Sequence, residues 1–265
     1  MKPTTSILFL FVVIALSGCG HRGSEANQVS CDNCNETFPL QINTDKGAIK
    51  GYLDQSSNAY VGIPYAAPPI QDLRWRPPQE VTPWQGVLDT THFKDFCVQP
   101  SHFTNRPGAS GNVTLAGNED CLYLNVWRPS SPKNNLPVVF FIGELSSGVG
   151  LQDGDEKLGG IYNGRNLSAE QNLIVVTLNY RLLQFGGLAH PALSFENSKI
   201  NGRTISGNFH FQDILKALNW IKNNVSNFGG SPSNITIYST SEGAIEALGL
   251  LTSDQAAGLF HKVMI

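Results

Sequence analysis

The 265-residue sequence contains little charge of either sign. Charged side chains make up 15% of it, against about a quarter in an average soluble domain. The balance of 18 Lys and Arg against 21 Asp and Glu leaves a net charge of −3, so the basic field that nucleic-acid binding requires is missing. The hydrophobic share of 41% excludes a disordered chain. Few charges, with 26 glycines and 15 prolines, favour a loop-rich protein outside the cytoplasm.

Long apolar runs are also missing, apart from a short one at the N-terminus. Residues 7–16 form an apolar run of about ten residues, too short to span a bilayer but typical of a signal-peptide core. The Leu-Ser-Gly before Cys19 matches a bacterial lipobox, in which Cys19 is lipidated; an ordinary cleaved signal remains the alternative. We expect a signal peptide over residues 1–18, a flexible tether over 19–38, and an exported protein. It would be secreted, or anchored to the cell envelope only through Cys19.

Cysteine is scarce, with five in the chain. Cys31 and Cys34 form a close pair in the tether, and a local disulfide and two free thiols both remain open. A metal site would need two further ligands nearby, so we expect none. Cys97 and Cys121 remain, and an oxidising compartment favours a bridge between them. Closing that loop would stabilise the fold by about 3 kcal/mol.

The pattern of apolar residues predicts an α/β fold. Residues 40–43 and 48–53 flank a turn and predict a small antiparallel hairpin, and further strands are expected at 60–63, 122–127, 136–142, 173–178 and 234–238. A helical stripe covers 211–225, and an Ala/Leu-rich helix follows residue 243. An antiparallel start followed by alternating strands and helices is typical of the α/β class.

A series of motifs resembles the type-B carboxylesterase/cholinesterase family. They are GIPYAAPP at 62–69 with LR at 73–74, WQGV at 84–87, EDCLYLNVW at 119–127, LPV at 136–138, NYRL at 179–182, GN at 207–208, Asp213, ALNW at 217–220 and NFGG at 227–230. The resemblance covers residues 39–265 and about the first half of the family's length. It implies an α/β-hydrolase fold truncated after the nucleophile helix, with a small N-terminal antiparallel sheet. It also implies the Cys97–Cys121 disulfide.

The same resemblance implies hydrolysis of small carboxylic esters by a serine nucleophile, without a cofactor. The family's Gly-x-Ser-x-Gly elbow reads Ser239-Thr240-Ser241-Glu242-Gly243 here. Ser241 is therefore the expected nucleophile. Serine replaces the first glycine, and we expect some strain there. Glu242 adds a carboxylate close to the reacting centre.

The expected oxyanion loop departs further from the family pattern. Where the family usually has His-Gly-Gly-Gly, this chain has Gly143, Glu144, Leu145 and Ser146. Glycines let consecutive N–H groups converge on an oxyanion. We expect the replacements to obstruct that backbone, and Glu144 to add a second negative charge.

No general base is evident for Ser241. Downstream of Glu242, the chain offers Glu246, Asp254 and His261, and His261 is expected to be a surface or packing residue. His190 and His210 lie upstream and are expected in loops. Without a base a serine hydroxyl is a poor nucleophile.

Three hypotheses therefore remain. The chain is a catalytically impaired ester hydrolase, a non-catalytic binding or adhesion protein on the same fold, or a decayed gene fragment.

Overall fold

The computed structural model describes residues 37–100, 115–143, 162–202, 204–241 and 243–265. The chain divides into two compact units, residues 1–35 and 36–265. The predicted signal peptide, tether and lipidation site at Cys19 lie outside the described residues, as do Cys31 and Cys34. Among the described residues, none of the helices has the length and apolar character needed to cross a membrane.

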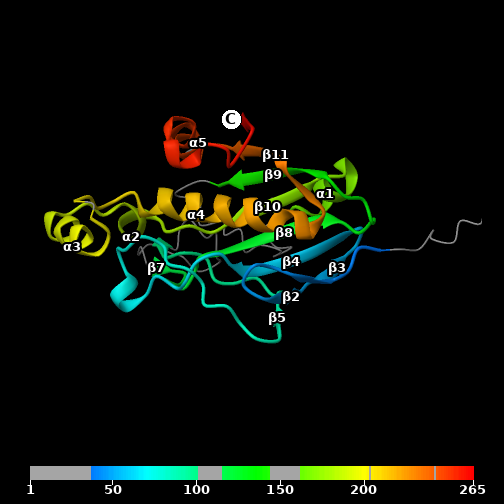
Figure 1. Cartoon of the computed structure of the whole chain (residues 1–265), viewed down its shortest axis with the longest axis horizontal. Helices are drawn as coiled ribbons and strands as arrows, with labels where there is room; N and C mark the ends of the chain where they lie inside the picture. Colours follow the sequence, from blue (N-terminus) through cyan, green and yellow to red (C-terminus); the bar gives the residue numbers. More distant parts are fainter. Residues whose placement is uncertain (1–36, 101–114, 144–161, 203, 242) are drawn as a thin grey trace, which may run out of the picture. The chain divides into compact units, whose positions relative to one another are not determined.

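In the described residues of the second unit, strands come first, from residue 41 to residue 142, and α-helices are interspersed with strands from residue 165 onward (Figure 1). The strands are β1 (Gln41–Asn43), β2 (Ala48–Lys50), β3 (Tyr52–Asp54), β4 (Ser57–Pro64), β5 (Val87–Asp89), β6 (Gln99–Pro100), β7 (Leu115–Ala116), β8 (Tyr123–Pro129), β9 (Leu136–Ile142), β10 (Ile174–Leu178), β11 (Gly230–Ser239) and β12 (Lys262–Met264). The helices are α1 (Arg165–Gln171), α2 (Leu183–Gly187), α3 (Pro191–Asn201), α4 (Phe209–Asn224) and α5 (Gly243–Thr252).

Seven of these strands form the main sheet, in the order β12-β11-β9-β10-β8-β4-β3. The first four in that order run parallel, and β8, β4 and β3 continue as antiparallel neighbours. The carboxyl ends of β9 and β11 therefore lie side by side, with Ile142 opposite Ser239. Ligand sites of open α/β sheets lie at such strand ends.

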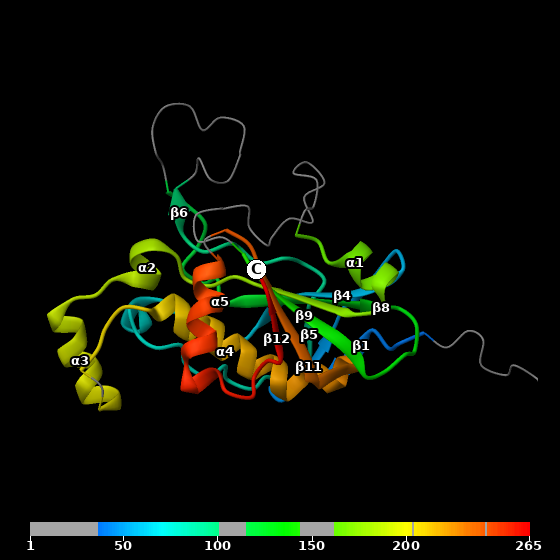
Figure 2. The same cartoon turned by 90° about the horizontal axis from the view of Figure 1, so that it is seen from above.

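Both faces of this sheet are covered, which explains why its strands read as continuous apolar runs. Val126 and Val176 contribute to the core on one face, while Trp127 and Val175 form a smaller cluster on the other. This alternation follows the two-residue period of a strand. Figure 2 shows α4 and α5 on one side of the sheet and α1 on the other.

The small N-terminal sheet differs from its prediction in two respects. The predicted strand 48–53 is divided at Gly51 into β2 and β3, and β3 joins the main sheet instead. β1 and β2 pair as the expected antiparallel hairpin, with Ile42 opposite Ile49. β5 then adds to β2 in parallel, so the three-stranded sheet is mixed. β5 could not be recognised from the apolar pattern because it has three residues, too few to show a period.

The end of β8 carries a fully buried arginine, Arg128. Its guanidinium donates hydrogen bonds to the carbonyl oxygens of Pro129 (2.6 Å), Phe228 (3.0 Å), Lys133 (3.0 Å) and Ser131, and lies 3.5 Å from the ring centre of Phe38. Burial lowers the pKa of Arg128 to about 10, which still leaves it charged at neutral pH. Carbonyl dipoles take the place of a carboxylate here.

Candidate active site

The predicted nucleophile elbow, residues 239–243, lies between β11 and α5. Ser241 has φ of +52° and is exposed in a turn. Within this turn, the amides of Gly243 and Ala244 donate to the carbonyl oxygens of Thr240 (3.1 Å) and Ser241 (3.0 Å). Positive φ is uncommon outside glycine and is concentrated at functional sites. A serine held in this way at a sharp strand-to-helix turn has the geometry of a nucleophile elbow.

Gly243 is required at this turn by close packing. A Cβ at this position would lie 2.5 Å from the carbonyl oxygens of both Ile142 and Gly143. Because those atoms belong to the backbone of a central strand and the residue after it, they have little room to move. The second glycine of the elbow therefore lets α5 begin directly against the end of β9.

The first residue of the elbow, Ser239, makes a contact that the elbow pattern does not predict. Ser239 is fully buried at the end of β11, and its hydroxyl donates a hydrogen bond of 3.1 Å to the carbonyl oxygen of Ile142. The serine thus adds a contact between β11 and β9. The pattern Gly-x-Ser-x-Gly does not reveal this, because it records only that the position is small.

The predicted oxyanion region is described in part. Gly143 is buried directly after β9, and its carbonyl oxygen accepts a 2.7 Å hydrogen bond from the Tyr180 hydroxyl. Glu144, Leu145, Ser146 and Glu242 lie outside the described residues. Their expected effect on an oxyanion therefore stays a prediction.

A cavity of about 230 Å³ lies beside the elbow on the α1 side of the sheet. Phe141, Tyr162 and Tyr238 contribute a cluster of aromatic rings with centres 5.3–5.5 Å apart. Thr240, the residue before Ser241, also lines this cavity. Its size is somewhat below that of a typical ligand pocket.

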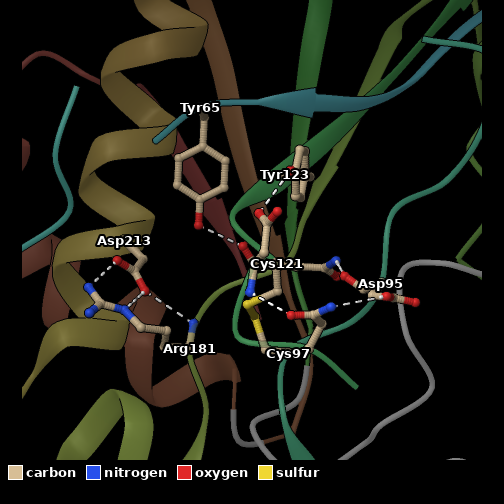
Figure 3. The surroundings of a disulfide bond; sticks show 10 residues. Tyr65, Asp95, Cys97, Cys121, Tyr123, Arg181 and Asp213 are labelled. Atoms are coloured by element: carbon tan, nitrogen blue, oxygen red, sulfur yellow. Dashed lines mark hydrogen bonds and ion pairs between the residues drawn. A yellow bond between two sulfur atoms is a disulfide. The ribbon is translucent and has the colours of Figure 1, made fainter. Parts of the chain in front are cut away.

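The structure joins Cys97 to Cys121, with Cα atoms 5.0 Å apart (Figure 3). Tyr65 is fully buried beside this bridge, and its hydroxyl donates a 2.6 Å hydrogen bond to the carbonyl oxygen of Asn179. Burial raises the pKa of Tyr65 well above its ordinary value. The segment after β10 is thereby attached to the segment after β4.

An ion pair fixes the chain next to this bridge. Arg181 donates to both carboxylate oxygens of Asp213, over 2.8 Å and 2.6 Å, and also to the carbonyl oxygen of Arg76 over 2.7 Å. The side chains of Arg181 and Asp213 are 4% and 0% exposed. Figure 3 shows the pair beside the disulfide. We call Tyr65, Cys97, Cys121, Arg181 and Asp213 the disulfide region.

The structure keeps His261 away from the elbow. Its Nδ1 accepts a 3.2 Å hydrogen bond from the amide of Ile235, in the middle of β11. About 13 Å of strand separates Ile235 from Ser239, at about 3.3 Å per residue, and Ser241 lies beyond. His261 is exposed, so the expectation of a surface or packing residue is confirmed, and His261 is not placed to act as a base for Ser241.

Of the other two histidines, His190 lies in a loop as predicted, whereas His210 lies in a helix and corrects the prediction. His190 caps α3, where its Nδ1 accepts from the amide of Ala192 over 3.2 Å. His210 is the second residue of α4 and approaches Glu246 of α5, with 3.3 Å between Nε2 and Oε1. The helical stripe predicted from residue 211 begins too late to include His210. The position of Glu246 could have indicated that it needs a partner, because it falls on the buried face of α5. The other residues of that face are Gly243, Ala247 and Leu250.

No group of three or more His, Cys, Asp or Glu side chains is placed to hold a metal ion within the described part of the chain. The chemistry available at the elbow is that of a serine hydroxyl at the end of a parallel strand. Such a hydroxyl attacks carbonyl carbon when a base takes its proton.

Known proteins share this arrangement. A sequence model of the carboxylesterase family matches residues 39–265. The fumonisin B1 esterase of Sphingopyxis macrogoltabida is 39% identical over 230 residues, and the match covers 85% of this chain and 39% of that protein. The para-nitrobenzyl esterase of Bacillus subtilis is 36% identical over 231 residues, with 84% and 42% covered.

Solved structures agree with these relatives. A PNB esterase structure superposes with a TM-score of 0.71 at 34% identity, covering 85% of this chain and 43% of that one. A carboxylesterase of Geobacillus stearothermophilus at pH 6.2 gives a TM-score of 0.69 at 33% identity, with 85% and 42% covered. The chain thus spans about two fifths of the length of these proteins. By its sequence motifs, its sheet order and its elbow, the chain belongs to the carboxylesterase family.

Proposed function

We propose that this chain carries the nucleophile of a carboxylic ester hydrolase, with Ser241 as the attacking group and a small ester as the substrate. The Ser241 oxygen would attack the ester carbonyl carbon, the alcohol would leave, and water would release the acid from the acyl-enzyme. The observation that carries the proposal is the positive φ of Ser241 at the strand-to-helix turn. No cofactor takes part in this reaction.

We further propose that the 265-residue chain alone hydrolyses simple aryl esters at trace rates. His261 is attached to the middle of β11, away from Ser241, and both ring nitrogens of His210 already have partners. A serine hydroxyl from which no histidine takes the proton reacts slowly. The carboxylates of Glu144 and Glu242 would further oppose an oxyanion.

The test compares the wild-type chain with Ser241→Ala on a short-chain p-nitrophenyl ester. Ser253→Ala, beyond α5, serves as a matched control. We expect wild type and Ser253→Ala to share a trace rate that Ser241→Ala lowers. Turnover of several per second, within the ordinary enzymatic range and lost in Ser241→Ala, would show that Ser241 has a base and contradict the trace-rate proposal.

Equal rates in all three chains would instead contradict the nucleophile proposal. The binding or adhesion hypothesis would then be favoured, because the fold would be kept without its reaction. The replaced glycines of the predicted oxyanion loop already point in that direction.

We also propose that the protein is exported and attached to the cell envelope through lipidated Cys19. The support is the short apolar run that ends at Leu-Ser-Gly-Cys19. Mass spectrometry of the mature N-terminus should find a diacylglyceryl cysteine. An unmodified N-terminus at another residue would contradict the anchor and leave a secreted protein.

A further inference from the structure

Three helices meet at His210. Its Nδ1 lies 2.9 Å from the carbonyl oxygen of Gly186 in α2, and its Nε2 lies 3.3 Å from Oε1 of Glu246 in α5. The side chain of Glu246 is 5% exposed and that of His210 is 20% exposed. One imidazole ring therefore joins α4, which carries it, to both neighbouring helices.

The hydrogen bonds at this ring require one extra proton. A carbonyl oxygen only accepts, so Nδ1 must carry a hydrogen to bond Gly186. In a neutral ring Nε2 would then be an acceptor, facing a carboxylate that also only accepts. The contact with Glu246 is attractive only when a proton lies between Nε2 and Oε1, on either partner.

The local charges agree with a protonated ring. From α4, Asp213 also faces His210, but Arg181 pairs with that carboxylate. From α5 comes the carboxylate of Glu246, and from α2 only the carbonyl oxygen of Gly186. With a protonated His210, the net charge of the four side chains of His210, Glu246, Asp213 and Arg181 is zero. With a neutral ring, one buried negative charge is left in excess.

Close packing prevents the ring from leaving this position easily. A Cβ on Gly186 would lie 2.3 Å from the carbonyl oxygen of Arg181 and 3.0 Å from the Cβ of His210. A Cβ on Gly249 would lie 3.0 Å from the ring of Phe211, on α4. The glycines of α2 and α5 thus bring both helices directly against α4.

We propose that His210 and Glu246 are a positioning pair, a proton-dependent link that holds the first turn of α5 against α4 and α2. Glu246 lies three residues after Gly243, where α5 begins. The link therefore also fixes the helical side of the elbow that carries Ser241. Only this last step rests on the proposed function, because the link itself exists with or without ester hydrolysis.

The direction of the pH dependence follows from the His210 pKa. Burial lowers the pKa of His210 and is the largest single effect. The hydrogen bond and charge of Glu246, with smaller effects from the Gly186 carbonyl oxygen and the Asp213 charge, together outweigh it and raise the pKa above its ordinary value of 6.5. A raised pKa in the folded protein means that the link is fully formed below the pKa of the unfolded chain. The link is lost as pH rises through the raised pKa.

The test is amide hydrogen exchange of α5, corrected for the intrinsic rate at each pH. In the wild-type chain we expect protection of these amides to fall about tenfold or more from about pH 6 to about pH 9, the effect of one charge-assisted hydrogen bond. In Glu246→Gln this fall should disappear, because the new amide can donate to a neutral Nε2 or accept from a charged one.

Two further variants complete the design. Glu246→Ala should lower the protection at every pH, because it removes the partner altogether. His190→Gln, at the cap of α3, should behave like wild type. Equal protection of wild type across this pH range, or an undiminished fall in Glu246→Gln, would overturn the proposal.

These outcomes are separate from those of the esterase test. Exchange of α5 is measured on the folded chain without substrate, so a chain without activity still reports on the link. If Ser241 proves inert while the fall in protection is present in wild type and missing in Glu246→Gln, the link stands and only its relation to catalysis is lost.

Discussion

The disulfide region and the elbow are held by contacts of different kinds. A covalent bridge and a fully buried bidentate ion pair, Arg181 with Asp213, fix the first region. The elbow depends on one serine hydroxyl, on the missing Cβ of Gly243 and on the shared proton of His210 and Glu246. The disulfide region is thus fixed by strong contacts, and the elbow by weak contacts that respond to single atoms and to pH.

The largest expected effect comes from breaking the ion pair of the disulfide region. Asp213→Asn leaves the guanidinium of Arg181 buried without its counter-charge, and we expect the free energy of unfolding to fall by about 3–5 kcal/mol. Denaturant unfolding followed by circular dichroism measures this loss. Arg74→Ala, in the more exposed pair with Glu119, should cost clearly less. Equal losses in both variants would remove the distinction between buried and exposed pairs.

Removing the covalent bridge should have the next largest effect. The double variant Cys97→Ser and Cys121→Ser opens a loop whose ends are 24 residues apart, and we expect a loss of about 3 kcal/mol. Unfolding of the oxidised wild type and of the variant gives the difference. Non-reducing peptide mapping should first find the Cys97–Cys121 peptide. Free thiols at both positions in folded, oxidised protein would contradict the bridge.

On the elbow side, Gly243→Ala introduces a Cβ only 2.5 Å from two backbone oxygens. We expect the stability to fall by about 1–3 kcal/mol, because α5 must move away from β9. Gly187→Ala is the matched control, since its Cβ would meet no atom closer than 4.0 Å. If both alanines are tolerated equally, the end of β9 is less rigid than the structure indicates.

The smallest expected effect belongs to Ser239→Ala, which deletes the hydroxyl that binds the Ile142 carbonyl. The loss should be about 1 kcal/mol, the net value of one neutral hydrogen bond. Thermal unfolding of the two proteins, at matched pH, measures it. A gain in stability would mean that the serine is strained after all, as the elbow pattern suggested.

The strands of the main sheet and the disulfide could be predicted from the sequence more completely than the contacts of the elbow. Apolar runs such as residues 136–142 and 173–178 predict buried strands because burial on both faces leaves a continuous signal. The motif around Cys121 predicted the disulfide through resemblance. In contrast, the contact of His210 with Glu246 joins two helices that are distant in sequence, and neither residue type specifies its partner. A carboxylate on the apolar stripe of α5 indicates that a partner is needed, but only packing identifies it.

The contacts of Arg128 also affect which parts of the protein can unfold locally. Its guanidinium needs oxygens from residues 129–133 and from Phe228 at the same time, so none of these segments can detach alone without leaving a buried charge unsolvated. The loop after β8 and the turn after α4 should therefore open only in the event that also separates β8 from the sheet. Surface segments that look peripheral thus belong to the most cooperative unit of the fold, and their slowest amides should exchange only by global unfolding.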